Sequence, residues 1–198
     1  MRRLLPALFA ALALPCAAAG LTVSVSGAGG AALPGAVVFL ESPAAAQAVR
    51  PLSEQEIGQQ NKTFMPDQLV ITRGTAVSFP NRDTTRHHVY SFSPTKVFEI
   101  KLYIGTPAAP VAFDKAGIGV LGCNIHDHMV AWVVIVDTPW FATADAGGRA
   151  VVKNAPPGDY RLRVWHRGLP PGSPPLDQAL KLPASGASIT ANLAGVRP

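Results

Sequence analysis

The chain has 198 residues, which is enough for one large domain or two small ones. Its 17 Lys and Arg residues against 12 Asp and Glu residues give a formal net charge of +5 at pH 7. The basic residues form no cluster interleaved with aromatic side chains, so nucleic acid is not expected as a partner. Glycine and proline are plentiful, with 18 and 19 residues, which is typical of a fold with many turns.

The first segment has the pattern of a secretory signal peptide rather than of an uncleaved membrane anchor. Met1–Leu14 contains two arginines near its start, followed by an apolar run that is too short to span a bilayer comfortably. An Ala-x-Ala cleavage signal follows at 17–19, so we expect residues 1–19 to be removed on export to the periplasm. No later segment is long and apolar enough to cross a membrane, so no membrane span is expected after cleavage. Cleavage would also remove Cys16 and leave Cys123 as the only cysteine.

The rest of the chain predicts many short β-strands. Val, Ile, Thr and Phe recur in short runs separated by turn residues, and convincing amphipathic helices are absent. We therefore predict an all-β fold built from β-sandwiches. One helical turn is predicted over Ser53–Gln59, where Ser53 can cap and Glu56 follows three residues later, and Ala44–Pro51 is expected to be a loop. The predicted strands are Leu21–Val25, Ala36–Leu40, Gln68–Thr72, Ala76–Phe79, His88–Phe92, Phe98–Leu102, Ile118–Cys123, Met129–Val136, Arg149–Lys153 and Tyr160–Trp165.

Two adjacent histidines follow the predicted strand Ala76–Phe79. A polar loop begins at Asn81, and His87 and His88 stand where the next strand begins. Successive side chains of a strand point to opposite faces, so these two histidines cannot easily reach the same metal ion. The alternation itself leaves open which of them is a ligand.

A second chemically distinctive group lies in the tight loop between two predicted strands. Cys123, His126 and Met129 follow one another in a Cys-x2-His-x2-Met pattern. A thiolate, an imidazole and a thioether are soft or borderline donors, which suit copper better than any hard cation. Zinc is disfavoured because the paired spacing of zinc sites is missing. Exported proteins usually employ cysteines in pairs, so the lone Cys123 needs another role, and metal ligation is one of them.

Both motifs resemble those of the cupredoxins, the type 1 blue copper family that includes amicyanin and plastocyanin. The family pattern N-x-x-x-x-P-H-N-V is similar to Asn81–Val89, and the spacing of the cysteine motif is that of amicyanin. The resemblance covers residues 61–137 and implies a Greek-key β-sandwich that binds one type 1 copper ion. The ligands that it implies are His87, Cys123, His126 and Met129.

Two positions depart from the family pattern. His88 stands where relatives commonly have Asn, so it either ties the two ligand loops together or is itself the first ligand in place of His87. The motif spacing favours His87. His128 stands at a position that is apolar in amicyanin, and we expect it on the rim of the site rather than as an axial donor in place of Met129.

The residues outside the cupredoxin-like unit are expected to form a second small β-sandwich. Ala31–Leu40 and Thr143–Trp165 resemble two halves of a carboxypeptidase regulatory-like, or prealbumin-type, sandwich, with an Asp-Ala-Gly turn and a Pro-Pro-Gly-Asp-Tyr turn. We therefore predict a host sandwich made of residues 20–45 and 138–198, because insertion of a unit at a surface loop is tolerated. The alternative is that Ala36–Leu40 is the first strand of the cupredoxin-like unit itself.

The resemblance implies a periplasmic protein that carries single electrons between redox partner proteins, such as a dehydrogenase as donor or a c-type cytochrome as acceptor. One alternative is a copper carrier or chaperone, although only three methionines are present. Another is a metal-free secreted scaffold. An enzyme is not expected, because neither part of the chain shows a catalytic constellation. We expect Asp83 and Asp127 to be turn residues or solvated charges, and His166 to be structural or exposed.

Overall fold

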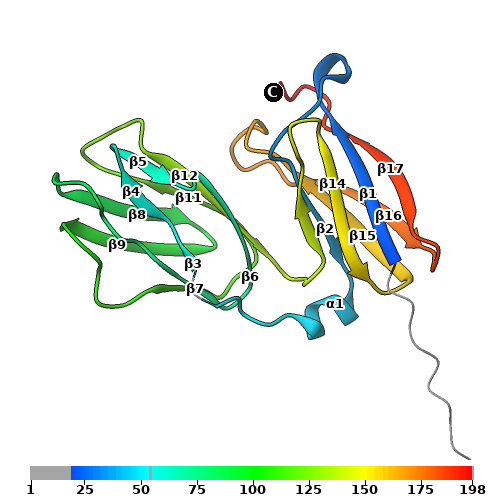
Figure 1. Ribbon diagram of the computed structural model, residues 1–198, viewed down its shortest axis with the longest axis horizontal. Helices are drawn as coiled ribbons and strands as arrows, with labels where there is room; N and C mark the ends of the chain where they lie inside the picture. Colours follow the sequence, from blue (N-terminus) through cyan, green and yellow to red (C-terminus); the bar gives the residue numbers. More distant parts are fainter. Residues whose placement is uncertain (1–18, 54, 198) are drawn as a thin grey trace, which may run out of the picture.

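The computed structural model describes residues 19–53 and 55–197. In this part the chain forms two β-sandwiches that lie next to each other, so the predicted all-β fold is confirmed (Figure 1). The predicted signal peptide, except for Ala19, and Cys16 with it lie outside the described residues. None of the described helices has the length and apolar character needed to cross a membrane.

The middle of the chain forms what we call the inserted sandwich, residues 55–136, cyan to green in Figure 1. Its larger sheet has the strand order β6-β12-β11-β8-β9 and its smaller sheet the order β10-β7-β3, with a separate β4–β5 hairpin. The strands are β3 Gln55–Glu56, β4 Gly58–Gln60, β5 Thr63–Met65, β6 Gln68–Thr72, β7 Thr75–Ser78, β8 His87–Ser93, β9 Lys96–Tyr103, β10 Val111–Phe113, β11 Gly117–Gly122 and β12 Val130–Val136.

The two outer parts of the chain fold together into what we call the terminal sandwich. Its sheets have the orders β14-β1-β17 and β13-β2-β15-β16, so the first two strands of the chain share their sheets with the last five. A relationship of this sandwich to the prealbumin type stays a prediction. The strands are β1 Ala19–Ser26, β2 Val37–Glu41, β13 Phe141–Thr143, β14 Arg149–Ala155, β15 Gly158–Trp165, β16 Leu176–Leu182 and β17 Ala187–Asn192, and a one-turn 3-10 helix, η1, spans Ala28–Gly30.

The apolar character of β12 and β2 follows from burial on both faces. Alternate residues of Ala131–Ile135 belong to the core of the inserted sandwich. Val134 points the other way, into a cluster that it shares with Val37 and Trp165 of the terminal sandwich. Burying a valine side chain stabilises a fold by about 1.5–3 kcal/mol, so this cluster contributes to holding the two sandwiches against each other.

Two local predictions are wrong. A helical turn was predicted over Ser53–Gln59, but the described residues of this stretch contribute β3 and β4 instead. Ile57 between them is fully buried, and its N–H donates to the carbonyl of Ser78 (3.0 Å), so pairing beside β7 outweighs the local capping pattern. A short helix, α1 Pro43–Ala48, forms where a loop was expected, because the Ser42 hydroxyl caps it and proline suits its first position.

His166, just after β15, has the structural role that was expected. Its Nε2–H donates to the carbonyl of Pro34 (3.1 Å), and its Nδ1 accepts from the N–H of Gly168 (3.0 Å). Both ring nitrogens are thus satisfied in the neutral imidazole. Burial lowers the pKa of His166, and the charge of Arg167 adds to this against the opposing effect of the Pro34 carbonyl.

Candidate metal centre

Three side chains of the described part of the chain converge on one point. They are His87 at the start of β8, and Cys123 and His126 in the loop between β11 and β12. One ligand atom of each lies within 4.8 Å of the others. Cys123 Sγ is 3.9 Å from His126 Nδ1, and the centroids of the His87 and His126 rings are 5.0 Å apart. These distances leave room for one ion bound by a thiolate and two imidazoles.

The His87 ring is held so that one nitrogen remains available. The ring is fully buried, and its Nε2 lies 2.8 Å from Asp83 Oδ2. A carboxylate only accepts, so Nε2 carries the proton and Nδ1 is left with its lone pair. This buried Nδ1 has no hydrogen-bond partner among the described residues. An unpartnered buried polar atom costs about 1–3 kcal/mol, which a metal ion bound at Nδ1 would offset.

Asp83 is a supporting residue of the site, which corrects the expectation that it is only a turn residue or a solvated charge. Besides its bond to His87, its carboxylate accepts from the N–H groups of Asn61 (2.7 Å) and Lys62 (2.9 Å). These two residues have positive φ angles of 54° and 55° at the turn between β4 and β5, as the tight turn of a hairpin requires. The Lys62 amide, followed by His87 and Asn61, lowers the pKa of Asp83 against the opposing effect of burial.

Asn81 closes the loop that carries Asp83. Its side-chain N–H groups donate to the carbonyls of Thr85 (2.9 Å) and Tyr103 (2.8 Å), and its Oδ1 accepts from the N–H of Asp83 (2.9 Å). Asn81 is buried, so these bonds are protected from water. The position of His87 is therefore defined by protein contacts alone.

The other ligand loop is anchored at both ends. Cys123 and Met129 are buried in the core of the inserted sandwich, and the Met129 N–H donates to the carbonyl of His126 (2.9 Å). The Tyr90 ring lies against Gly122, where an added Cβ would come within 2.7 Å of it, so glycine gives the strand a close approach just before the cysteine. Met129 thus lies at the buried end of the loop, and its role as axial ligand stays a prediction.

The structure does not bring the two alternative ligands into the group of three. The Nε2 atom of His88 lies 2.8 Å from Glu99 Oε1, and its ring is 5.6 Å from that of Tyr90, on the other face of β8. His128 is exposed, and its Nε2 lies 3.0 Å from the carbonyl of Lys62. The geometry therefore favours His87 over His88, and it places His128 on the rim.

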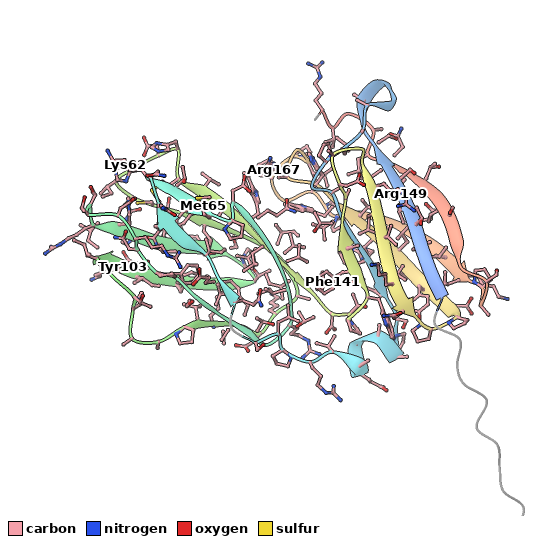
Figure 2. All side chains as sticks on the ribbon, in the orientation of Figure 1. Lys62, Met65, Tyr103, Phe141, Arg149 and Arg167 are labelled. Atoms are coloured by element: carbon pink, nitrogen blue, oxygen red, sulfur yellow. The ribbon has the colours of Figure 1, made fainter. Side chains whose placement is uncertain are left out.

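The site lies toward the end of the inserted sandwich that is remote from the terminal sandwich. Lys62 and Tyr103, whose backbones bind the two ligand loops, mark this end in Figure 2. His126 is half-buried, and Ile125 beside it is 46% exposed. Desolvation, followed by the electrostatic effects of the neighbouring His87 and Lys62, lowers the pKa of His126, which favours the neutral imidazole that binds metals.

Comparisons with known proteins place copper proteins among the similar structures. No family model matches the chain, and no curated protein matches it. A reduced Cu(I) form of an amicyanin mutant is 20% identical, with a TM-score of 0.39, over 50% of this chain and 98% of that one. A purple cupredoxin from Nitrosopumilus maritimus is 21% identical, with a TM-score of 0.37, over 42% of this chain and 100% of that one.

A third similar structure is a copper-containing nitrite reductase from Thermus scotoductus. It is 24% identical, with a TM-score of 0.40, over 45% of this chain and 23% of that one. The shares of this chain show that each of these likenesses spans half of it or less. The functional assignment of the site therefore rests on its geometry.

Proposed function

We propose that the inserted sandwich is a cupredoxin, which holds one copper ion in a type 1 site and carries single electrons. The observation that supports this most is the convergence of a buried thiol and two imidazoles within 4.8 Å, one of them with a buried, unpartnered nitrogen. Among biological metals, copper is well suited to this donor set, because the set combines a thiolate with imidazoles.

The residues of the site are suited to this task. Bound copper would supply a one-electron couple. Cys123 would bind as a thiolate, and His87 and His126 as neutral imidazoles. Asp83 keeps the proton of His87 on Nε2, so Nδ1 would be left unprotonated to bind the ion. With Met129 as a fourth donor, no open position remains for a substrate, which favours a carrier over an enzyme.

The supporting hydrogen bonds suit an electron carrier in particular. Asn81 and Asp83 hold one ligand loop, and the His126–Met129 turn holds the other, by contacts that do not involve a metal. Ligands held in this way move little when the charge of the ion changes. The half-buried His126 edge is the side of the site that a redox partner can approach.

The cellular setting is part of the proposal. The signal-like pattern of residues 1–19 supports a periplasmic location, and the family resemblance supports a dehydrogenase or a c-type cytochrome as the redox partner. A copper-loaded protein that exchanges electrons with such a cytochrome in stopped-flow mixing would support this setting.

The test of the function is addition of Cu(II) to the purified mature chain. An intense visible thiolate-to-copper band and a reversible one-electron wave are expected. Cys123→Ser is expected to abolish the band, and His126→Ala to disrupt it. His87→Ala is expected to remove the band, whereas the matched variant His88→Ala should keep it, because His88 faces Glu99.

One result would change the first ligand, and two others would contradict the proposed function. Loss of the band in His88→Ala and its retention in His87→Ala would show that His88, and not His87, is the first ligand. Binding of Cu(I) alone, colourless and readily passed to a chelator, would indicate a copper carrier. Absence of copper binding would indicate a metal-free scaffold. Met129→Gln is a finer test, since it should shift the reduction potential while copper stays bound.

A further inference from the structure

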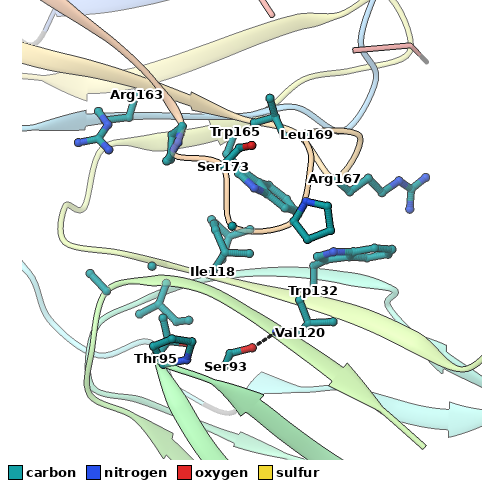
Figure 3. A pocket seen from close by; sticks show the side chains of 18 of the residues that line it. Ser93, Thr95, Ile118, Val120, Trp132, Arg163, Trp165, Arg167, Leu169 and Ser173 are labelled. Carbon is teal, nitrogen blue, oxygen red and sulfur yellow. Dashed lines mark hydrogen bonds between the residues drawn. The ribbon is translucent and has the colours of Figure 1, made fainter. Parts of the chain in front are cut away.

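A groove with a cavity volume of about 780 Å³ lies between the two sandwiches (Figure 3). The inserted sandwich lines it with residues such as Ile118 and Trp132, and the terminal sandwich with Trp165 and Leu169. None of the residues of the candidate metal centre lines it. Its volume falls in the range of about 300–1,000 Å³ that is typical of small-molecule sites, which often lie between domains.

The groove offers aromatic surfaces from both sandwiches. Figure 3 shows Trp165 on one side and Trp132 on the other, with Ile118 nearby. The guanidinium carbon of Arg167 lies 5.8 Å from the centroid of the Trp132 ring, which places a planar cation over the indole. Aromatic faces of this kind favour a flat, apolar ligand over a flexible or a fully polar one.

The charges of the groove favour an anion. Three basic residues line it, Lys115, Arg163 and Arg167, against one acidic residue, Glu41. Arg163 pairs with Glu41 (3.1 Å), and Arg167 pairs with Asp67 (2.5 Å). Among the described residues, Lys115 has no ion pair. The ammonium group of Lys115 is therefore the positive charge at the groove that is available to an anionic ligand.

Two polar atoms in the walls of the groove have no hydrogen-bond partner among the described residues. They are Thr95 Oγ1 and Arg163 Nε, and both are buried. Buried polar groups are nearly always satisfied, so each of these needs an explanation. A ligand oxygen in the groove is one such explanation.

We propose that this groove binds a small planar aromatic molecule that carries one oxyanion, such as a carboxylate or a sulfonate. The rings lie in the groove against Trp132 and Trp165, and the anion faces Lys115 and the polar atoms of Thr95 and Arg163. This binding site is separate from electron transfer at the metal centre and does not depend on it.

Two fluorescent probes with the same ring system test the proposal on the mature chain. One is 1-anilinonaphthalene-8-sulfonate, an anion whose naphthalene rings are planar, and the other is N-phenyl-1-naphthylamine, which lacks the sulfonate. We expect saturable binding of one anion per chain, with quenching of tryptophan fluorescence, at least about 10-fold tighter than binding of the neutral probe. Equal affinities for the two probes would overturn the choice of an anionic ligand.

Variants separate the groove from the other apolar surfaces. Trp132→Leu should lower the affinity for both probes about 10-fold. Trp140→Leu, outside the groove, should leave both affinities unchanged. Lys115→Gln should weaken only the anion, by about 5-fold, because it removes a charge and no aromatic surface. Phe92 is 77% exposed on the surface of the inserted sandwich, and Phe92→Ser should leave the affinity for both probes unchanged.

Loss of binding in Phe92→Ser, or its full retention in Trp132→Leu, would overturn the proposal. Probe binding should be the same with and without copper and in Cys123→Ser. Failure of this site can therefore be distinguished from failure of the proposed electron-transfer function.

Discussion

Replacing Asp83 with alanine is expected to loosen the metal centre without removing any proposed ligand. The carboxylate holds three donors, namely the amides of Asn61 and Lys62 and the Nε2–H of His87. The two amides belong to an exposed turn, so water can replace the carboxylate there. The His87 ring is fully buried, so its Nε2–H would lose its partner inside the protein.

The expected loss follows from these three bonds. A buried donor left without a partner costs about 1–3 kcal/mol, and two water-exposed bonds add about 0.5 kcal/mol each. Asp83→Ala should therefore lower the free energy of unfolding of the metal-free protein by about 3 kcal/mol. Because Nε2–H no longer fixes the ring, the affinity for copper should fall by about 10–100-fold.

Urea unfolding of the metal-free protein and a competition titration with copper measure the two effects. Asp114→Ala is the control, because Asp114 is 73% exposed and its Oδ2 makes a long ion pair with Lys96 Nζ, at 3.7 Å. The stability gap between wild type and Asp83→Ala should be full above pH 4 and should shrink below it. The folded pKa of Asp83 is lowered, so its stabilisation is lost as the pH falls through that value. A stability loss no larger than that of the control, or an unchanged copper affinity, would refute the reasoning.

Three further predictions concern packing and protonation. Val134→Asp, at a fully buried position between the sandwiches, should lower the free energy of unfolding by about 4 kcal/mol in calorimetry, whereas Val97→Asp, at a 67% exposed position, should change it by less than about 0.5 kcal/mol. The free energy of unfolding should fall as the pH drops from 7 through about 6.5, because His166 is protonated at a higher pH in the unfolded chain than in the folded one. His166→Gln should flatten this part of the pH profile of urea unfolding. Gly122→Ala should displace the Tyr90 ring and cost about 1–2 kcal/mol in urea unfolding, with a weaker copper band in absorption.

The strands with a buried face were predictable because their alternation or apolar runs reflect that burial. The strands β3, β4, β5, β10, β13, β16 and β17 were missed, and each has a strand partner on one side only. Edge strands keep many side chains in water, as Asp177 and Lys181 in β16 illustrate, so their pattern is weak.

The spacing of Cys123, His126 and Met129 is local, so the short loop by itself determines that these donors lie close together. Strand alternation likewise determined that His87 and His88 face opposite ways. It could not decide which one faces inward, because that depends on how β8 pairs with β11 and packs against the smaller sheet.

The tertiary structure alone decided the role of Asp83 and the existence of the groove. Asp83 meets the amide of Lys62 across 21 positions of the chain, and Trp132 and Trp165 face the same groove from different sandwiches. A short sequence pattern records the spacing of neighbours. It does not record which distant backbone donors or aromatic faces come together when two sheets pack.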